Sequence, residues 1–196
     1  MNPLPESVEV RRGTPRDAAT LLALQHRLDA QSRFMLLEPG ERADDPAAVA
    51  RRLGDQLGFD ILAFHHDIAV GWAQVEVQPW ARVRHIGYVV LGVDREHHAR
   101  GVGTRLMKAA VHEAGVAGLT RLELTVMTDN APAIRLYLRH GFVVEGVRRR
   151  AIMRGSGQYV DELSMGLLLP GPTSRQSPVG AGRAPRRSAS PSAVRR

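Results

Sequence analysis

The sequence predicts an α/β domain built on a mixed, mostly antiparallel sheet. A strand and a helix open the chain, a meander of three strand patterns follows, and strands then alternate with helices up to residue 169. At 196 residues, the chain is long enough for one well-buried domain and short for two. We therefore expect one domain over residues 1–169 and a disordered tail over residues 170–196.

The first half supplies four strands and two helices. A strand is expected at Val8–Arg12, and a helix follows Thr14-Pro15, with apolar residues at helical spacing from Ala18 to Leu28. Asp44-Asp45-Pro46 combines a cap with a first-turn proline, which predicts a second helix through about Leu57. The meander strands are expected at residues 59–64, 68–77 and 85–93.

The second half supplies two helices and three strands, so the sequence predicts four helices and seven strands in all. Helical patterns run from Val102 to about Glu113 and from Ala131 to Arg139. Between them, residues 121–127 alternate as a strand with Leu122, Leu124 and Val126 on one face. The last strands are expected at residues 142–147 and 159–168, around a turn at residues 155–157.

The net charge of +7 and the pI near 11.0 come from the tail. Residues 170–196 hold six of the 27 basic residues and no acidic one, so the other 21 nearly balance the 20 acidic residues. The tail is rich in Pro, Ser, Gly and Ala and has little apolar area to offset the entropy of ordering. We expect no specific nucleic-acid partner, with salt-sensitive DNA contact through the tail as the alternative.

Composition also limits the compartment and the chemistry. No apolar run approaches the roughly 18 residues that cross a bilayer, and residues 1–13 lack a secretory apolar core. We expect a cytoplasmic protein with no membrane partner. The lack of cysteine excludes disulfides and a thiol nucleophile. We expect no metal site, because His65-His66 and His97-His98 have no accompanying carboxylate cluster and sequence neighbours on a strand point apart.

A glycine-bearing turn separates the buried strand from the next helix. In the run His98-Ala99-Arg100-Gly101-Val102-Gly103-Thr104, the glycines allow close approach to the backbone just before a helix N-terminus. Free N–H groups and the positive end of the helix dipole favour an anion there, and Arg100 can add a charge-assisted contact. The segment predicts a diphosphate site, with an ordinary tight turn as the alternative.

Two other phosphate motifs fit this turn less well. A P-loop requires Gly-Lys followed by Ser or Thr, which Gly103-Thr104-Arg105 lacks. A dinucleotide fingerprint requires Gly or Ala in place of Leu106, although Glu123 stands about where its ribose-binding acid is expected. Because Glu123 lies inside a predicted strand and a meander precedes the turn, the dinucleotide interpretation is disfavoured.

A second segment runs from Asn130 to Tyr137. Asn130 is a favourable helix cap, and Pro132 suits the first turn. Seven residues separate Asn130 from Tyr137, so their side chains share one helix face, roughly 10 Å apart along the axis. That face can line a cleft, with an ordinary cap and an ordinary core tyrosine as the alternatives.

Together these segments resemble the GNAT acetyltransferases. The resemblance covers about residues 8–169 and implies a GNAT fold, whose sheet is splayed at its centre, with acetyl-CoA as cosubstrate in the opening. Within the family, the second half is similar to bacterial L-amino acid N-acetyltransferases. The segments that carry the resemblance are residues 85–93, Arg100 to Gly103, Arg121 to Val126, Asn130 to Tyr137, Gly141-Phe142, Glu145-Gly146, Tyr159 to Glu162 and Met165.

The resemblance also implies roles for single residues. Backbone groups near Leu91 and Val93 would bind the pantetheine arm and polarise the thioester carbonyl. Asn130 would contact the cofactor arm, and Tyr137 would protonate the departing thiolate. The family usually has Arg or Gln at the position of His98 and often Gly at that of Ala99, so these two contacts depart from the pattern. The diphosphate would be held by His98, Ala99, Arg100, Gly101, Val102, Gly103 and Thr104.

The sequence indicates one candidate for the general acid but no single candidate for the general base. A phenol near pKa 10 protonating a thiolate near 8.5 is uphill by about 1.5 units, or roughly 2 kcal/mol. That cost is offset if the cleft lowers the pKa of Tyr137 or if the proton moves late, as the thiolate develops. The sequence does not fix a general base. Glu76, His85 and Glu162 are candidates, each with a solvated strand face as the alternative.

The acceptor is expected to be the primary amine of a small molecule, with an amino acid as the first candidate. At pH 7 an α-amine is about 11% neutral and a lysine amine about 0.04%, so a weakly equipped site favours amines of low pKa. The family resemblance assigns specificity to residues 33–38, and Arg33, Arg82 or Arg84 can attract a carboxylate. Protein N-terminal acetylation and a non-catalytic acetyl-CoA sensor are the alternatives, and a homodimer is compatible with the sequence.

Overall fold

The computed structural model describes residues 8–55 and 57–171 and confirms a seven-stranded mixed sheet with four α-helices. The tail from residue 172 onward, expected to be disordered, lies outside the described residues. The strands are β1 (Val8–Arg12), β2 (Gly58–His65), β3 (Ile68–Val77), β4 (Ile86–Val93), β5 (Arg121–Met127), β6 (Val143–Met153) and β7 (Tyr159–Leu168). The helices are α1 (Ala18–Gln31), α2 (Pro46–Gly54), α3 (Val102–Val116) and α4 (Ala131–Arg139).

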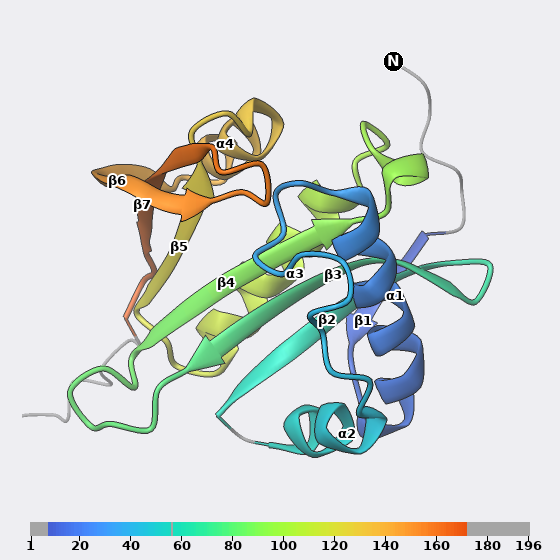
Figure 1. Cartoon of the computed structure of the whole chain (residues 1–196). Helices are drawn as coiled ribbons and strands as arrows, with labels where there is room; N and C mark the ends of the chain where they lie inside the picture. Colours follow the sequence, from blue (N-terminus) through green and yellow to red (C-terminus); the bar gives the residue numbers. More distant parts are fainter. Residues whose placement is uncertain (1–7, 56, 172–196) are drawn as a thin grey trace, which may run out of the picture.

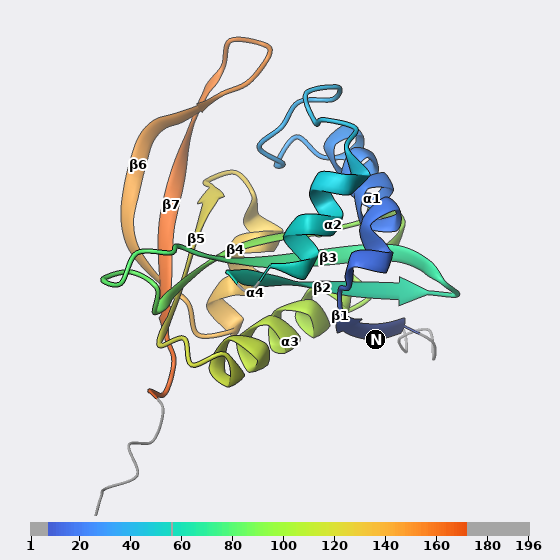
Figure 2. The ribbon, with the colours of Figure 1, turned by 90° about the horizontal axis from the view of Figure 1, so that it is seen from below.

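Helices cover both faces of the sheet. Helices α1 and α2 lie on one face, called the α1 face below, and α3 lies on the other (Figure 2). On the α1 face, Leu24 and Leu28 of α1 pack with Trp72 of β3. On the opposite face, Leu106 of α3 and Leu136 of α4 belong to the main core. No helix among the described residues is long and apolar enough to span a bilayer.

Strands β4 and β5 diverge along their length. The strand order is β1-β2-β3-β4-β5-β7-β6, and only β4 and β5 are parallel. Their pairing covers Ile86–Tyr88 against Arg121–Glu123, after which β4 continues to Val93 and β5 to Met127. Figure 1 shows the two strands separating from this closed end. The expected splay is therefore present, and it opens one edge of β4 from Val89 to Val93.

Several element bounds differ from the sequence prediction. Helix α2 ends at Gly54 because Asp55 is extended (φ −73°, ψ 154°), and α3 continues three residues beyond Glu113. Strand β6 reaches Met153 rather than Val147. An irregular pairing around Arg150, whose φ is +51°, carries the strand past its charged residues while it stays paired with β7.

A buried carboxylate joins α2 to the sheet. The Asp60 side chain on β2 is 2% exposed. It accepts hydrogen bonds from Trp72 Nε1 at 2.6 Å and from Arg52 Nη1 at 2.6 and 2.8 Å. Since Arg52 lies on α2 and Trp72 on β3, one carboxylate connects three elements. Its removal would leave a buried indole N–H and a partly buried cation without this partner.

We expect Asp60→Ala to lower the free energy of unfolding by about 2–4 kcal/mol, because a carboxylate that satisfies two buried or half-buried donors is lost. Denaturant-induced unfolding measures the change. Glu9→Ala removes an exposed carboxylate from β1 and should change the stability by no more than about 0.5 kcal/mol. Equal effects of the two substitutions would contradict this account of Asp60.

Candidate active site

Helix α3 begins without a side-chain cap. Helix α4 is capped by Asn130, whose side chain accepts a hydrogen bond from the Ala133 N–H at 3.3 Å. Gly101 precedes α3, offers no such acceptor, and the first turn of α3 contains no acid. The N–H groups of residues 102–104 therefore lie at the positive end of the helix dipole with no side chain capping them. Such an arrangement favours an anion, and a diphosphate at this turn stays a prediction.

The turn before α3 contains two left-handed residues, Ala99 (φ +57°) and Gly101 (φ +78°). A side chain in this region is strained by roughly 1–2 kcal/mol, which explains why glycine suits the position of Ala99. Position 103 needs a small residue for a different reason. A Cβ there would lie 3.2 Å from Leu136 of α4, so α3 and α4 meet closely where the turn ends.

His98 supports the end of β4. Its Nε2 lies 2.8 Å from the Val93 carbonyl oxygen, and since a carbonyl can only accept, Nε2 carries the hydrogen. The bond occupies one carbonyl at the open end of β4. A contact between His98 and a diphosphate remains a prediction.

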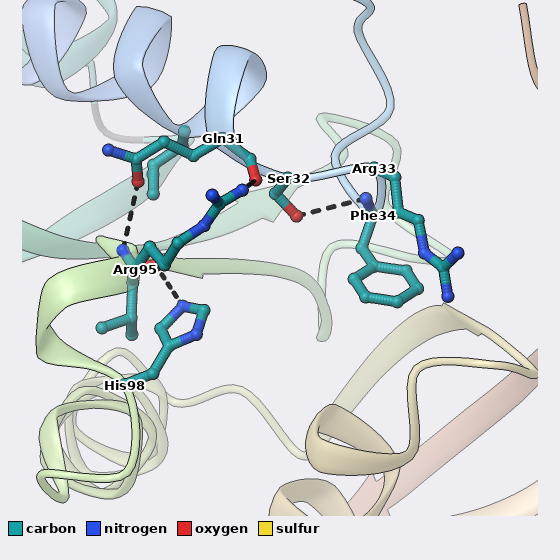
Figure 3. Close-up of a pocket in the computed structure, with 8 residues that line it drawn as sticks. Gln31, Ser32, Arg33, Phe34, Arg95 and His98 are labelled. Carbon is teal, nitrogen blue, oxygen red and sulfur yellow. Dashed lines mark hydrogen bonds between the residues drawn. The ribbon is translucent and has the colours of Figure 1, made fainter.

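A cavity of about 350 Å³ adjoins the end of β4. Figure 3 shows that the C-terminal end of α1 and the segment after it line one side, opposite Arg95 and His98. Arg95 is held in place because its N–H donates to Gln31 Oε1 at 3.1 Å and its guanidinium donates to the Gln31 carbonyl. Two arginines among apolar groups suit a ligand that is both anionic and partly apolar. The lining residues are Leu28, Gln31, Ser32, Arg33, Phe34, Val93, Arg95 and His98.

Tyr137 is buried on α4, with its ring centroid 5.9 Å from that of Phe142. Burial raises the pKa of Tyr137 to about 12, and the nearby phenol of Tyr88 adds to the rise. The hypothesis that the cleft lowers this pKa is therefore wrong, because an apolar environment disfavours the phenolate. The phenol stays protonated at neutral pH. Transfer of the phenol's proton to a thiolate with a pKa near 8.5 would be uphill by about 3.5 pKa units, roughly 5 kcal/mol. An acid role for Tyr137 therefore requires that the proton move late.

Polar side chains cross the opening on the α1 face. Tyr88 of β4 reaches across to Thr125 of β5, with 2.8 Å between the hydroxyl oxygens. Thr125 donates to Glu162 Oε1 of β7 at 3.2 Å, and Arg148 of β6 donates to Glu162 Oε2 at 2.9 Å. The sequence indicated Glu162 but not Tyr88 or Thr125. The available signal was the position of Thr125 between Leu124 and Val126, which places it on the face opposite the apolar one.

The other base candidates are placed differently. Glu76 is exposed on β3, directly opposite Tyr88 in the sheet register. His85 precedes β4, and its carbonyl accepts from the Thr120 N–H at 3.0 Å, at the closed end where β4 and β5 still pair. The structure therefore brings Glu76 near the polar side chains of the opening and leaves His85 outside it.

The segment between α1 and α2 contacts the far side of the opening. Arg33 Nη2 lies 3.3 Å from Asp129 Oδ2, just before α4. The Gly155 N–H in the β6–β7 turn donates to Glu38 Oε1 at 3.4 Å. Arg42 anchors the same segment to α1 through Asp29, at 2.6 and 3.1 Å. We call residues 33–38 the roof, because they connect the two halves of the splayed sheet on the α1 face.

Three histidines lie together, which corrects the expectation that sequence neighbours point apart. His66 has a left-handed backbone (φ +47°), and its ring centroid lies 4.3 Å from that of His65. The ring of His97 lies 5.3 Å from that of His65. Within residues 8–55 and 57–171, no group of three or more His, Cys, Asp or Glu side chains is arranged to hold a metal ion.

Known proteins share both the sequence pattern and the fold. Residues 23–142 match the acetyltransferase (GNAT) family. The chain is 34% identical to the L-amino acid N-acetyltransferase AaaT of Escherichia coli K12 over 116 residues, which are 58% of this chain and 71% of that protein. It is 32% identical to a mycothiol acetyltransferase of Clavibacter michiganensis subsp. michiganensis over 147 residues, 71% of this chain but only 44% of that protein.

Solved structures show the same architecture. A GNAT-family acetyltransferase from Streptococcus pneumoniae has a TM-score of 0.79 at 28% identity, covering 84% of this chain and all of that one. The protein yncA from Salmonella typhimurium, solved with its cofactor acetyl-CoA, has a TM-score of 0.75 at 18% identity, covering 88% of this chain and 99% of that one. The chain belongs to the GNAT acetyltransferase family and is an enzyme that uses acetyl-CoA as its cosubstrate.

Proposed function

We propose that the protein acetylates the primary amine of a small molecule and that an amino acid is the first candidate acceptor. The roof carries this proposal, because Arg33 and Glu38 contact Asp129 and the Gly155 N–H across the opening. A long peptide or a folded protein would have to displace these contacts, whereas a small amine would not. The similarity to an L-amino acid N-acetyltransferase supports an amino acid.

Each part of the opening has a task in this reaction. Acetyl-CoA supplies the thioester. The uncapped N–H groups that begin α3 would hold its diphosphate, and the amide NH2 of Asn130 is available to the cofactor arm because Oδ1 caps α4. The open edge of β4 at Val89–Val93 would stabilise negative charge on the carbonyl oxygen as the amine attacks. Tyr137 would donate its proton to sulfur as the C–S bond breaks.

One arginine is well placed for a substrate carboxylate. Arg82 and Arg84 lie in the loop before β4, near the closed end, whereas Arg33 lies in the roof. The Arg33 guanidinium stacks over the Phe34 ring at 5.0 Å, and one of its Nη atoms faces Asp129. A guanidinium has five N–H donors, so others remain for a carboxylate.

A panel of amines tests the acceptor class. With acetyl-CoA and thiol detection, we expect kcat/KM at least about tenfold higher for free L-amino acids than for peptides with the same first residue. Higher activity on peptides would favour protein N-terminal acetylation, and dominant turnover of internal lysines would contradict the preference for low-pKa amines. Calorimetric binding of acetyl-CoA without thiol release from any amine would make the protein a sensor.

Substitution of Arg33 tests the carboxylate contact. We expect Arg33→Gln to raise KM about 3–10-fold for amino acids, a modest effect because this side chain is 63% exposed. KM for matched amines without a carboxylate should stay unchanged. Arg84→Gln, in the loop before β4, is the control. An equal rise in KM for both kinds of amine would argue against a carboxylate contact.

Tyr137→Phe tests the acid. We expect binding of coenzyme A to persist in calorimetry while kcat falls about 10²-fold or more. Because the pKa of Tyr137 is about 12, its protonated form persists well above pH 10, and kcat should not fall between pH 7 and 10 through loss of this proton. A decline near pH 10 that is present in the wild type and absent from Tyr137→Phe would contradict the raised pKa, whereas a kcat of Tyr137→Phe within about threefold of the wild type would contradict the acid role.

A further inference from the structure

We infer that Tyr88, Thr125 and Glu162 form a proton relay that takes a proton from the bound amine and delivers it to Glu162, the general base. The three side chains lie on β4, β5 and β7 and are linked by hydrogen bonds of 2.8 and 3.2 Å. The inference rests on the proposed function, since it requires an amine acceptor beneath the roof.

Chemistry fixes the direction of both hydrogen bonds. Glu162 accepts from Arg148 through Oε2, and its Oε1 accepts the single hydroxyl hydrogen of Thr125. Thr125 can then only accept from Tyr88, so the phenol donates its own hydrogen to Thr125. The remaining lone pair of the Tyr88 oxygen is available to accept an N–H from a substrate. The relay therefore begins at Tyr88 and ends at the carboxylate.

Tyr88 stands where the opening begins. It is the last β4 residue paired with β5, its side chain lies on the α1 face, and the residue is 37% exposed. Its phenol contributes to the raised pKa of Tyr137. An amine between them would have a proton acceptor on one side and the thioester, with its acid Tyr137, on the other.

Glu162 has the burial and the partners of a terminal acceptor. Its side chain is 10% exposed, and the negative charge is compensated by Arg148, which is 56% exposed and borders solvent. Other charged groups near the relay include Glu76, opposite Tyr88 on β3, and Glu123 on β5, which is bonded to Arg121. For any one carboxylate, taking a proton from an α-amine near pKa 7.9 is about 300-fold easier than from a lysine near 10.4. The relay therefore suits the low-pKa acceptors proposed above.

The protons and electrons balance. The ammonium passes a proton to the Tyr88 oxygen, Tyr88 passes its own to Thr125, and Thr125 passes its own to Glu162. The neutral nitrogen forms the N–C bond, the C–S bond breaks with its electron pair on sulfur, and Tyr137 protonates the sulfur. The second proton that leaves nitrogen restores the phenol of Tyr137, and Glu162 releases the first to solvent.

A pair of substitutions at Thr125 tests the relay. Thr125→Val keeps the shape but removes the hydroxyl, and Thr125→Ser retains the hydroxyl. At pH 7 we expect Thr125→Val and Glu162→Gln to lower kcat/KM for an α-amine about 10²-fold, and Thr125→Ser to stay within about threefold of the wild type. Calorimetric binding of coenzyme A should be unchanged, and each variant should keep a cooperative unfolding transition. Glu123→Gln, at a carboxylate on the same face outside the relay, is the control and should match the wild type.

The pH dependence separates a relay from a structural brace. Above the pKa of the amine the nucleophile is already neutral, and the neutral fraction rises about ninefold between pH 7 and 9.5. The deficit of Thr125→Val in kcat/KM should therefore shrink from about 10²-fold to about tenfold by about pH 9.5. A constant deficit from pH 6.5 to 9.5, or wild-type activity of Thr125→Val at pH 7, would overturn the relay while leaving the proposed function intact. No thiol release by the wild type with any amine would remove the proposed function, and the relay with it.

Discussion

The early end of hydrogen bonding between β4 and β5 is the constraint on which the rest of the site depends. Three paired residues hold the two strands together, and beyond Tyr88 the sheet divides. Division of a sheet exposes backbone groups that would otherwise be satisfied by a neighbouring strand, so a ligand can replace that strand. The same division sets α3 and α4 side by side on one face, where Gly103 meets Leu136, and leaves the other face for an acceptor.

Side-chain contacts connect the two halves of the sheet. Arg33 of the roof contacts Asp129, and the hydrogen bond from Tyr88 to Thr125 spans the closed end of the opening. Each contact joins an element of the first half of the chain to one of the second. The opening is therefore bounded above and below by polar contacts, while its walls are strands and helices that pack on separate parts of the core.

The two faces of the opening offer different chemistry. Near Tyr137 the surroundings are apolar, which keeps the phenol protonated, as the proposed acid role requires. On the α1 face the Glu162 carboxylate accepts hydrogen bonds from the Arg148 guanidinium and from the Thr125 hydroxyl. A weak acid on the leaving-group side and a carboxylate on the nucleophile side suit attack by an amine followed by departure of a thiol.

The sequence by itself determined the order of strands and helices, the bounds of β5 and α4, the uncapped glycine turn before α3 and the cap at Asn130, because periodicity and capping are local properties of the chain. It did not determine the length of β6. Three consecutive arginines there do not resemble a strand in sequence, but the segment stays extended because it pairs with β7. Only the tertiary structure showed that Tyr88, Thr125 and Glu162 meet, that Arg33 faces Asp129, and that burial raises the pKa of Tyr137. These are contacts between residues far apart in sequence, and strand register and helix packing, rather than any local pattern, bring them together.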